Sequence, residues 1–188
     1  LLFAGMGAFL SAFLDALTVT AVIIAVGVGF FKVYHRVASG KGLQDEYDHT
    51  MDHGVGTLHR SNLEEFRGFL RNLLMHGAVG TALGGVCTLV GEPQNLLIGE
   101  KAGWNFIEFF IRMSPVTIPV LIVGFLTCVL VERFRWFGYG FSLPEAVRDI
   151  LWRFDRETSR KMDHRFIARL IVQGLAMIWL IVALAFHL

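Results

Sequence analysis

Apolar residues in this chain fall in long uninterrupted blocks rather than at the spacing of an amphipathic surface helix. Four such blocks, separated by polar stretches, cover residues 1–31, about 72–98, 106–131 and 166–188. Each is long enough for a helix to cross the hydrocarbon core of a bilayer, which takes roughly 20 residues. The pattern therefore predicts an all-α membrane protein and not a soluble core.

The first block, residues 1–31, is longer than a single crossing requires and holds one charged residue, Asp15. Such a segment either spans the membrane with a tilt or enters it and returns as a hairpin. A secretory signal peptide is a third interpretation, but it requires a basic n-region and a small-residue cleavage site. We find neither in residues 1–31.

Basic residues concentrate in two long polar connections. Residues 32–71 contain six Lys and Arg, residues 132–165 contain eight, and the short turn at 99–103 contains one. Because positively charged loops are retained on the cytoplasmic side, we expect both connections to face the cytoplasm and the turn to face outward.

Each long connection carries the pattern of a helix start. Ser61 with Glu64, and Ser142 with Glu145, have capping-box spacing. The apolar stripes that follow are Leu63, Phe66, Leu70, Leu73 and Leu74 in the first, and Leu143, Val147, Ile150, Leu151 and Phe154 in the second. The first stripe predicts a helix leading into the membrane. The second predicts an interfacial helix with Trp152 near the headgroups, for which a structural role is favoured over a regulatory one.

Composition and charge exclude little beyond the soluble classes. The chain is 54% hydrophobic, and its net charge is +1. Binding of nucleic acid needs basic residues massed on one face, and this net charge does not indicate such a face. Cys87 and Cys128 lie in different membrane blocks, so we expect no disulfide and interpret both as small packing residues. Both ends lie inside apolar blocks and no initiator Met is present. We therefore interpret residues 1–188 as one membrane transport domain fragment, with the remainder of the polypeptide as a partner.

A carboxylate in the first apolar block is the first candidate for chemistry. Asp15 stands in the stretch Ser-Ala-Phe-Leu-Asp-Ala-Leu-Thr-Val-Thr, residues 11–20. A charged residue at a helix centre in the membrane costs roughly 2.5 to 3.5 kcal/mol on insertion scales, so its presence is by default a functional hypothesis. The alternative is a protonated Asp that is hydrogen-bonded to a neighbouring helix.

A second stretch interrupts the apolar pattern at residues 84–95, where the sequence is Gly-Gly-Val-Cys-Thr-Leu-Val-Gly-Glu-Pro-Gln-Asn. Three glycines and Pro93 disfavour a regular helix, and a membrane protein tolerates unwound backbone only where it is buried in protein or lines a wet cavity. Freed carbonyls there are cation ligands, as in discontinuous transporter helices. The alternative is a kinked packing helix in which Thr88 and Asn95 bond to other helices.

Together the two stretches resemble the ion-transporter superfamily of arsenite permeases, sodium/proton antiporters and sodium-coupled dicarboxylate carriers. The segments Phe-Leu-Asp-Ala-Leu-Thr-Val-Thr-Ala-Val and Gly-Glu-Pro-Gln-Asn-Leu-Leu-Ile are similar in particular to the NhaB family of bacterial sodium/proton antiporters. The resemblance covers essentially the whole chain. It implies that these residues belong to an inverted-repeat transporter whose second half lies outside this sequence.

The resemblance also implies a site. It makes residues 1–31 a re-entrant hairpin with Ser11, Asp15 and Thr18 at its tip. The groups it places on the broken helix opposite are Gly84, Gly85, Thr88, Gly91 and Asn95. Two departures stand out: Ala16 replaces a common Asn, which argues against a carboxylate substrate, and Gln94 replaces a second proline, which we do not interpret.

We expect sodium, a hard cation, to bind among oxygen ligands at Asp15, with hydroxyl, amide and backbone oxygens completing the site. Burial favours the protonated carboxyl, so Asp15 would hold a proton when sodium is absent and release it when sodium binds. Rocking this site between the two membrane faces would exchange the ions. The substrates expected are sodium and protons, with no cofactor, in a multi-pass protein of the bacterial inner membrane.

Three other groups and several other classes stay open. Glu92 and His76 are candidate accessory groups, for coordination and pH sensing respectively; an interfacial glutamate and a hydrogen-bonded interfacial histidine are the alternatives. His49, His53 and His59 are residues of a type that binds metal ions, but their spacing matches no recognised metal site.

A sodium-coupled anion symporter is the second transport hypothesis. An intramembrane aspartyl protease would need a second carboxylate, and a membrane scaffold leaves the oxygen-rich break unexplained. Lipid is an expected partner, a homodimer is left open, and nucleic acid is not expected.

Overall fold

The computed structural model describes residues 1–39, 60–160 and 164–186, and all regular structure in these residues is helical. The elements are α1 (Leu2–Ser11), α2 (Ala16–Ala38), α3 (Arg60–Gly85), α4 (Pro93–Ala102), α5 (Phe106–Phe134), the short 3₁₀ helix η3 (Trp136–Gly138), α6 (Glu145–Arg160) and α7 (His164–Phe186). The helical class expected from the sequence is therefore confirmed for the described part of the chain.

The first apolar block folds as two helices with a break between them. α1 ends at Ser11, residues 12–15 are non-helical, and α2 begins at Ala16. Asp15 is the N-cap of α2, a role that carboxylates fill well because they accept hydrogen bonds from the free N–H groups of the first turn. α2 continues to Ala38 and so extends beyond residue 31, where the sequence pattern placed the end of the hairpin. That the pair re-enters the membrane stays a prediction.

α1 packs closely against α3 through small residues. A methyl group added at Gly80 would collide with the backbone of Ala4, and one added at Gly84 would collide with the backbone of Ala8. Both pairs are spaced by four residues, one helical turn, so each helix presents a smooth stripe to the other. This close contact fixes α1 against α3 and brings its last residue, Ser11, to the end of α3.

The second motif breaks its helix as the glycines and Pro93 predict. α3 runs without interruption from Arg60 to Gly85, residues 86–92 are turns, and α4 begins at Pro93, the first-turn position that proline favours. The predicted lead-in helix is confirmed, but Ser61 lies inside α3 and not at its cap. The predicted turn at 99–103 is also shorter than expected, because α4 ends at Ala102. Its C-cap is Gly103, whose φ of 67° suits glycine.

Two helices are long and apolar enough to cross a membrane within the described residues. They are α2, with 23 residues, and α5, with 29. α5 contains Pro115, which cannot donate to the Ile111 carbonyl, and the Ser114 hydroxyl donates to that carbonyl instead at 3.0 Å. In α7 the apolar run Ile167–Leu180 is shorter.

α6 docks on the ends of α2 and α3. Val147, with 0% exposure, packs in a cluster with Tyr34 and Phe66, and Leu143, Ile150 and Leu151 lie against it. Four of the five residues of the predicted apolar stripe lie in or against this cluster, and Trp152, at 59% exposed, points away from it. Ser142 does not cap this helix, because the Arg148 N–H bonds to the Pro144 carbonyl and α6 begins at Glu145.

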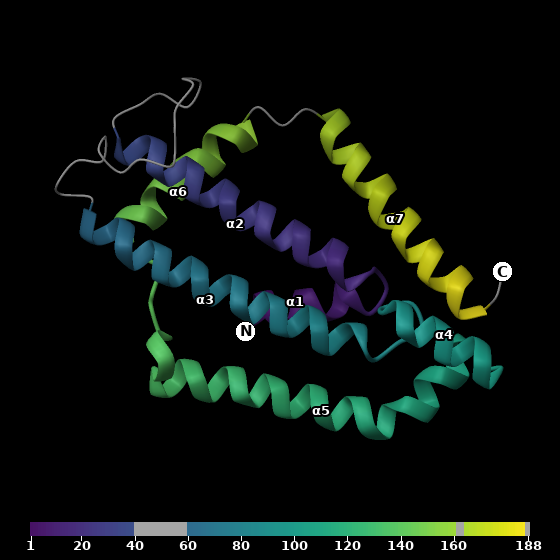
Figure 1. Cartoon of the computed structure of the whole chain (residues 1–188). Coiled ribbons are helices and arrows are strands. Elements are labelled where there is room, and N and C mark those ends of the chain that lie inside the picture. Colours follow the sequence, from purple (N-terminus) through teal and green to yellow (C-terminus); the bar gives the residue numbers. More distant parts are fainter. Residues whose placement is uncertain (40–59, 161–163, 187–188) are drawn as a thin grey trace.

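α2, α3 and α5 lie roughly side by side, α7 is inclined to them, and α6 lies across one end (Figure 1). The end of α2, the start of α3 and the end of α5 share this end of the molecule, whereas the α3/α4 break and the start of α5 lie at the other. The Arg71 guanidinium donates to the Gly138 carbonyl at 2.9 Å and so joins the two basic connections. The site residues predicted from the sequence gather at the opposite end, around the break.

Candidate functional site

Four helix ends meet at the break. α1 and α3 end there, at Ser11 and Gly85, and α2 and α4 begin there. Two hydrogen bonds hold the 12–15 break against the 86–92 break: the Ala16 N–H donates to the Gly91 carbonyl at 3.3 Å, and the Thr88 hydroxyl donates to the Ala12 carbonyl. The structure thus joins the two motifs that lie some seventy residues apart in the sequence.

Asn95 holds the shape of the 86–92 break. Its side-chain amide is buried and donates to the Gly85 carbonyl at 3.1 Å and to the Thr88 carbonyl at 2.8 Å. These carbonyls belong to residues at the end of α3 and inside the break, where helical partners are missing. Asn95 therefore replaces the lost helical hydrogen bonds, and Thr88 does the same for the end of α1.

Three oxygens converge beside Gly85. A methyl group added to Gly85 would lie 2.9 Å from Glu92 Oε1, 3.0 Å from Ser11 Oγ and 3.1 Å from the Gly91 carbonyl. Ser11 is 0% exposed, and its hydroxyl has no hydrogen-bond partner in the part of the chain that the structure describes. The space that glycine leaves open is thus faced by a carboxylate, a hydroxyl and a carbonyl.

The place where the 12–15 break meets the 86–92 break is called the junction below. Asp15 lies at this junction but directs its carboxylate along α2. Its Oδ2 accepts from the Thr18 N–H at 3.1 Å and from the Thr18 hydroxyl at 3.4 Å. Asp15 is partly exposed and Thr18 is exposed. The deep burial on which the sequence argument relied is therefore not seen in these residues.

Gly84 and Gly91 make close backbone contacts. Gly84 faces Ala8 of α1, and a methyl group at Gly91 would collide with the Gly85 carbonyl and lie 2.6 Å from the Ser11 carbonyl. Both glycines let the end of α1 approach the break.

One polar pair near the site escaped the sequence analysis. The hydroxyls of Thr20 in α2 and Thr81 in α3 lie 3.1 Å apart, and Thr81 is buried. Thr81 also donates to the Ala78 carbonyl at 2.8 Å. The available signal was the helical spacing of Thr81 from Gly77 and Gly84, which places it on the face that α1 and α2 cover.

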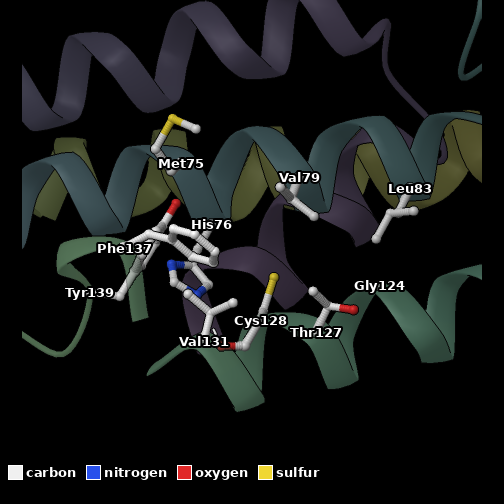
Figure 2. Close-up of a pocket in the computed structure, with 10 residues that line it drawn as sticks. All are labelled: Met75, His76, Val79, Leu83, Gly124, Thr127, Cys128, Val131, Phe137 and Tyr139. Carbon is white, nitrogen blue, oxygen red and sulfur yellow. Dashed lines mark hydrogen bonds between the residues drawn. The ribbon is translucent and has the colours of Figure 1, made fainter. Parts of the chain in front are cut away.

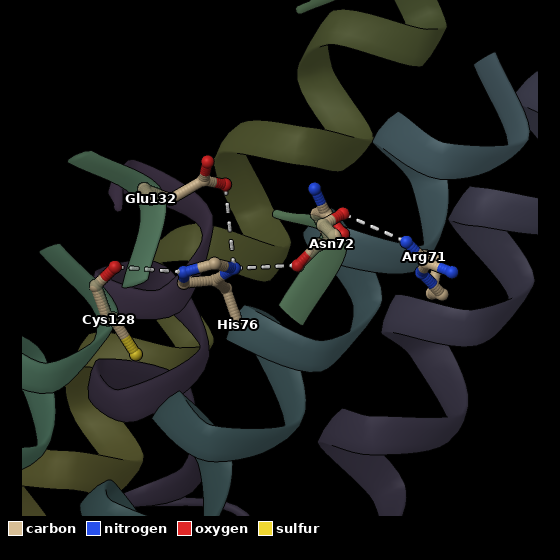
Figure 3. Close-up of polar contacts among 6 residues, drawn as sticks. Arg71, Asn72, His76, Cys128 and Glu132 are labelled. Carbon is tan, nitrogen blue, oxygen red and sulfur yellow. Dashed lines mark hydrogen bonds and ion pairs between the residues drawn. The ribbon is translucent and has the colours of Figure 1, made fainter. Parts of the chain in front are cut away.

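His76 lies away from the break. It is nine residues before Gly85 on α3, which corresponds to about 13 Å at about 1.5 Å per residue. Its Nδ1 lies 2.7 Å from the Asn72 carbonyl and 3.9 Å from a Glu132 carboxylate oxygen, and its Nε2 lies 3.4 Å from the Cys128 carbonyl (Figure 3). His76 therefore links α3 to α5.

A cavity of about 580 Å³ opens beside His76, between α3 and α5 (Figure 2). Its lining residues are Met75, His76, Val79, Leu83, Gly124, Thr127, Cys128, Val131, Phe137 and Tyr139. The one hydroxyl that α5 contributes, that of Thr127, donates to its own helix at Val123. This lining is too apolar for a cation, which needs several oxygen ligands.

Two C-terminal and two N-terminal helix ends meet at the break, and each N-terminal end has an acidic N-cap residue. The C-terminal ends of α1 and α3 carry partial negative charge, and the Thr88 hydroxyl and the Asn95 amide donate to carbonyls there. The N-terminal ends of α2 and α4 carry Asp15 and Glu92 as their N-cap residues. The junction therefore combines carbonyls, a hydroxyl and carboxylates, which is the ligand chemistry that hard cations prefer.

The other candidate metal ligands were His49, His53 and His59. Within the described residues, no group of three or more His, Cys, Asp or Glu side chains is placed to hold a metal ion. His49, His53 and His59 lie outside those residues. Cys87 and Cys128 are both free and buried, as their positions in separate blocks predict.

The family model described as bacterial Na⁺/H⁺ antiporter B (NhaB) matches residues 1–188. The relative from Hahella chejuensis, described as Na⁺/H⁺ antiporter NhaB, is 60% identical over 188 residues, which is 100% of this chain and 38% of the relative. A protein of the same description from Vibrio cholerae is 59% identical over 186 residues, 99% of this chain and 35% of its own length. The corresponding Salmonella typhimurium protein is 57% identical, with 100% and 36% covered. No solved structure matches the chain.

Proposed function

The chain belongs to the bacterial Na⁺/H⁺ antiporter B (NhaB) family, and on this premise we propose that it forms part of a secondary transporter that exchanges sodium for protons. The chain spans little more than a third of the relatives that it matches, at 38% and 35% of their length. The exchange activity is thus proposed for the whole polypeptide, with the remainder completing the transport path. The bacterial inner membrane is the compartment we propose.

The observation that carries this proposal is the docking of one helix break on another. The Ala16 N–H bond to the Gly91 carbonyl and the Thr88 bond to Ala12 join the α1/α2 break to the α3/α4 break. Discontinuous helices whose ends face a shared polar space are a recurring ion site in secondary transporters. Asp15 supplies a carboxylate at this junction that can bear either a proton or a metal ion.

In the proposed cycle, sodium binds at the junction as a proton leaves a carboxyl group there, so the two ions occupy the site in turn. Movement of the loaded site between the membrane faces then exchanges one ion for the other. Carbonyls at the ends of α1 and α3 and the Ser11 hydroxyl favour the cation without adding net charge.

The test is Asp15→Asn in the full-length protein, assayed in reconstituted vesicles for sodium-driven proton movement. Asn caps helices about as well as Asp, so the start of α2 should be retained while the ionisable group is lost. We expect the exchange rate to fall at least about a hundredfold.

Asp149→Asn is the matched control, because Asp149 is exposed on α6 and far along the chain from the junction. We expect that variant to exchange at the wild-type rate. Unchanged exchange in Asp15→Asn would remove Asp15 from the mechanism. Sodium entry accompanied by an anion, with no opposed proton movement in the wild type, would replace the antiporter proposal with the symporter.

A further inference from the structure

We propose that the cavity between α3 and α5 binds one anionic phospholipid, with an acyl chain inside the cavity and the phosphate at the end where Phe137 and Tyr139 lie. We call this end the mouth. The cavity has a volume of about 580 Å³, and α3, α5 and the segment after α5 line it (Figure 2). It lies beside His76, away from the junction, so the inference goes beyond the proposed exchange and does not depend on it.

The inner part of the cavity suits a hydrocarbon chain. Its wall extends eight residues along α3, from Met75 to Leu83, which is about 12 Å at about 1.5 Å per residue. One leaflet provides half of a hydrocarbon core of roughly 30 Å, which is about 15 Å. The cavity therefore has the depth of a single leaflet. Its apolar lining side chains between the two ends are those of Met75, Val79, Leu83 and Val131.

Two arginines flank the mouth. The Arg71 guanidinium donates to the Gly138 carbonyl at 2.9 Å. On the other side of Tyr139, a methyl group added at Gly140 would collide with the Arg135 side chain, so that side chain lies against the same segment. A guanidinium has five N–H donors, and it binds phosphate with two of them at once. Arg71 can therefore hold Gly138 and still donate to a phosphate group.

The segment that closes the mouth is aromatic and strained. Phe137 lines the cavity yet is 87% exposed, and Trp136 is 53% exposed with its ring stacked on that of Phe134. Exposed aromatic side chains at the end of a membrane span are typical of the headgroup level. Arg135 and Phe137 both have left-handed backbone, with φ of 53° and 55°, which side chains other than glycine rarely adopt. Such strain clusters where a protein holds a ligand.

The charge around the mouth selects an anionic lipid. Arg71 and Arg135 are exposed, and Glu132 places a carboxylate oxygen 3.9 Å from His76 Nδ1 at the same end. Among these described groups, two guanidinium groups face one carboxylate. Basic pockets between membrane helices bind anionic headgroups on the cytoplasmic side, which is the side that the positive-inside rule predicts for this end. A zwitterionic lipid offers the same chain without the net charge.

Titration with phosphatidylglycerol tests the headgroup contacts, with phosphatidylcholine as the reference lipid. In the full-length protein in detergent, phosphatidylglycerol should raise the melting temperature more than phosphatidylcholine does. Arg71→Gln should raise the half-saturating fraction of phosphatidylglycerol about fivefold, which corresponds to about 1 kcal/mol per basic residue near an anionic surface. Arg71→Lys should recover part of the affinity.

Arg133→Gln is the matched control for charge. Arg133 is exposed near the end of α5, two residues after Val131, and so lies about 200° around the helix from that lining residue. It should leave the half-saturating fraction unchanged.

Val79→Phe tests the acyl chain. Val79 lines the cavity and is 38% exposed, so the larger side chain can extend into the open space. We expect this variant to lose most of the rise specific to phosphatidylglycerol. Val129→Phe is the matched control, because Val129 is 37% exposed on α5 and lies outside the lining. Should Val79→Phe fail to fold, Thr127→Leu adds apolar volume at an exposed lining position and makes the same test.

Three results would overturn the proposal. Equal rises with the two lipids in the wild type would show that the cavity does not select an anionic headgroup. An undiminished rise in Val79→Phe or Thr127→Leu would show that no acyl chain occupies the cavity, as when the rest of the polypeptide fills it. Equal losses in Arg71→Gln and Arg133→Gln would reduce the effect to diffuse surface charge. All three readouts are lipid binding, so an inactive Asp15→Asn or an inactive wild type would judge only the exchange proposal.

Discussion

At the scale of single residues, the junction is organised by side chains that replace missing backbone hydrogen bonds. Asp15 accepts from the first turn of α2, Thr88 donates to the end of α1, and Asn95 donates to two carbonyls of the α3/α4 break. Each of these groups compensates for a helix end that the membrane would otherwise leave unsatisfied. Residue types that suggested cation ligands from the sequence therefore also stabilise the fold. Ser11 differs, because its hydroxyl has no hydrogen-bond partner within residues 1–39, 60–160 and 164–186.

Asn95→Asp tests this account of the break. The substitution keeps the shape of the side chain but replaces an amide donor with an oxygen that faces the Gly85 and Thr88 carbonyls. We expect a loss of about 1–3 kcal/mol in the free energy of unfolding, the cost of leaving buried polar groups unpaired. Denaturant unfolding of the full-length protein gives the measurement.

Gln94→Glu makes the same chemical change one residue earlier, where the side chain is exposed, and should cost less than about 0.5 kcal/mol. Equal losses in Asn95→Asp and Gln94→Glu would show that added negative charge, and not the two lost hydrogen bonds, is responsible.

At the scale of elements, the close contact of α1 with α3 positions the site. Gly80 faces Ala4, and Gly84 faces Ala8, so backbone lies directly on backbone. Apolar burial contributes little between helices in lipid, where the surroundings are as apolar as the side chains, so such close packing is a main source of association. The 12–15 break reaches the 86–92 break because both helices are smooth along these stripes.

Gly80→Ala should separate α1 from α3. Its methyl group would meet backbone atoms of Ala4, which cannot rotate away as a side chain can. We expect an overpacking cost of about 1–3 kcal/mol in unfolding free energy and a matching loss of exchange. Gly5→Ala is the control. Gly5 lies in α1, and a methyl group added there would have nothing within 4 Å, so this variant should retain both stability and exchange. Wild-type stability in Gly80→Ala would show that α1 is not held by this contact.

The helices and the break were predictable from the sequence because their signals are local. Uninterrupted apolar runs gave α2 and α5, and the glycines with Pro93 gave the break at 86–92. The helix starts were predicted less accurately. Ser61 and Ser142 have the spacing of a capping box but do not cap their helices, because packing of Leu63 and Val147 decides where these helices lie. The convergence of Glu92 and Ser11 depends on contacts between residues about eighty positions apart, which spacing along one chain does not reveal.

At the scale of the whole molecule, the end of α2, the start of α3, the end of α5 and α6 lie at one end, and the α3/α4 break lies at the other (Figure 1). The Arg71 bond to the Gly138 carbonyl and the His76 contacts with α5 hold that end together. The cluster around Val147 adds α6 to the same end. This arrangement is what the alternation of basic residues along the chain predicts, because an odd number of crossings separates the 99–103 segment from either connection.

Cysteine labelling tests the orientation of the full-length protein. Lys101 near the end of α4 and Ser142 before α6 are both exposed, and α5 separates them with 29 residues, enough to cross a hydrocarbon core of about 30 Å. Cys87 and Cys128 are buried and can be replaced by Ala or left as a low background. By the positive-inside rule, a membrane-impermeant maleimide should label Lys101→Cys in intact cells and Ser142→Cys only in inverted vesicles. Labelling of both from the same side would mean that α5 does not span, and it would place Lys101 and Ser142 on one face of the membrane.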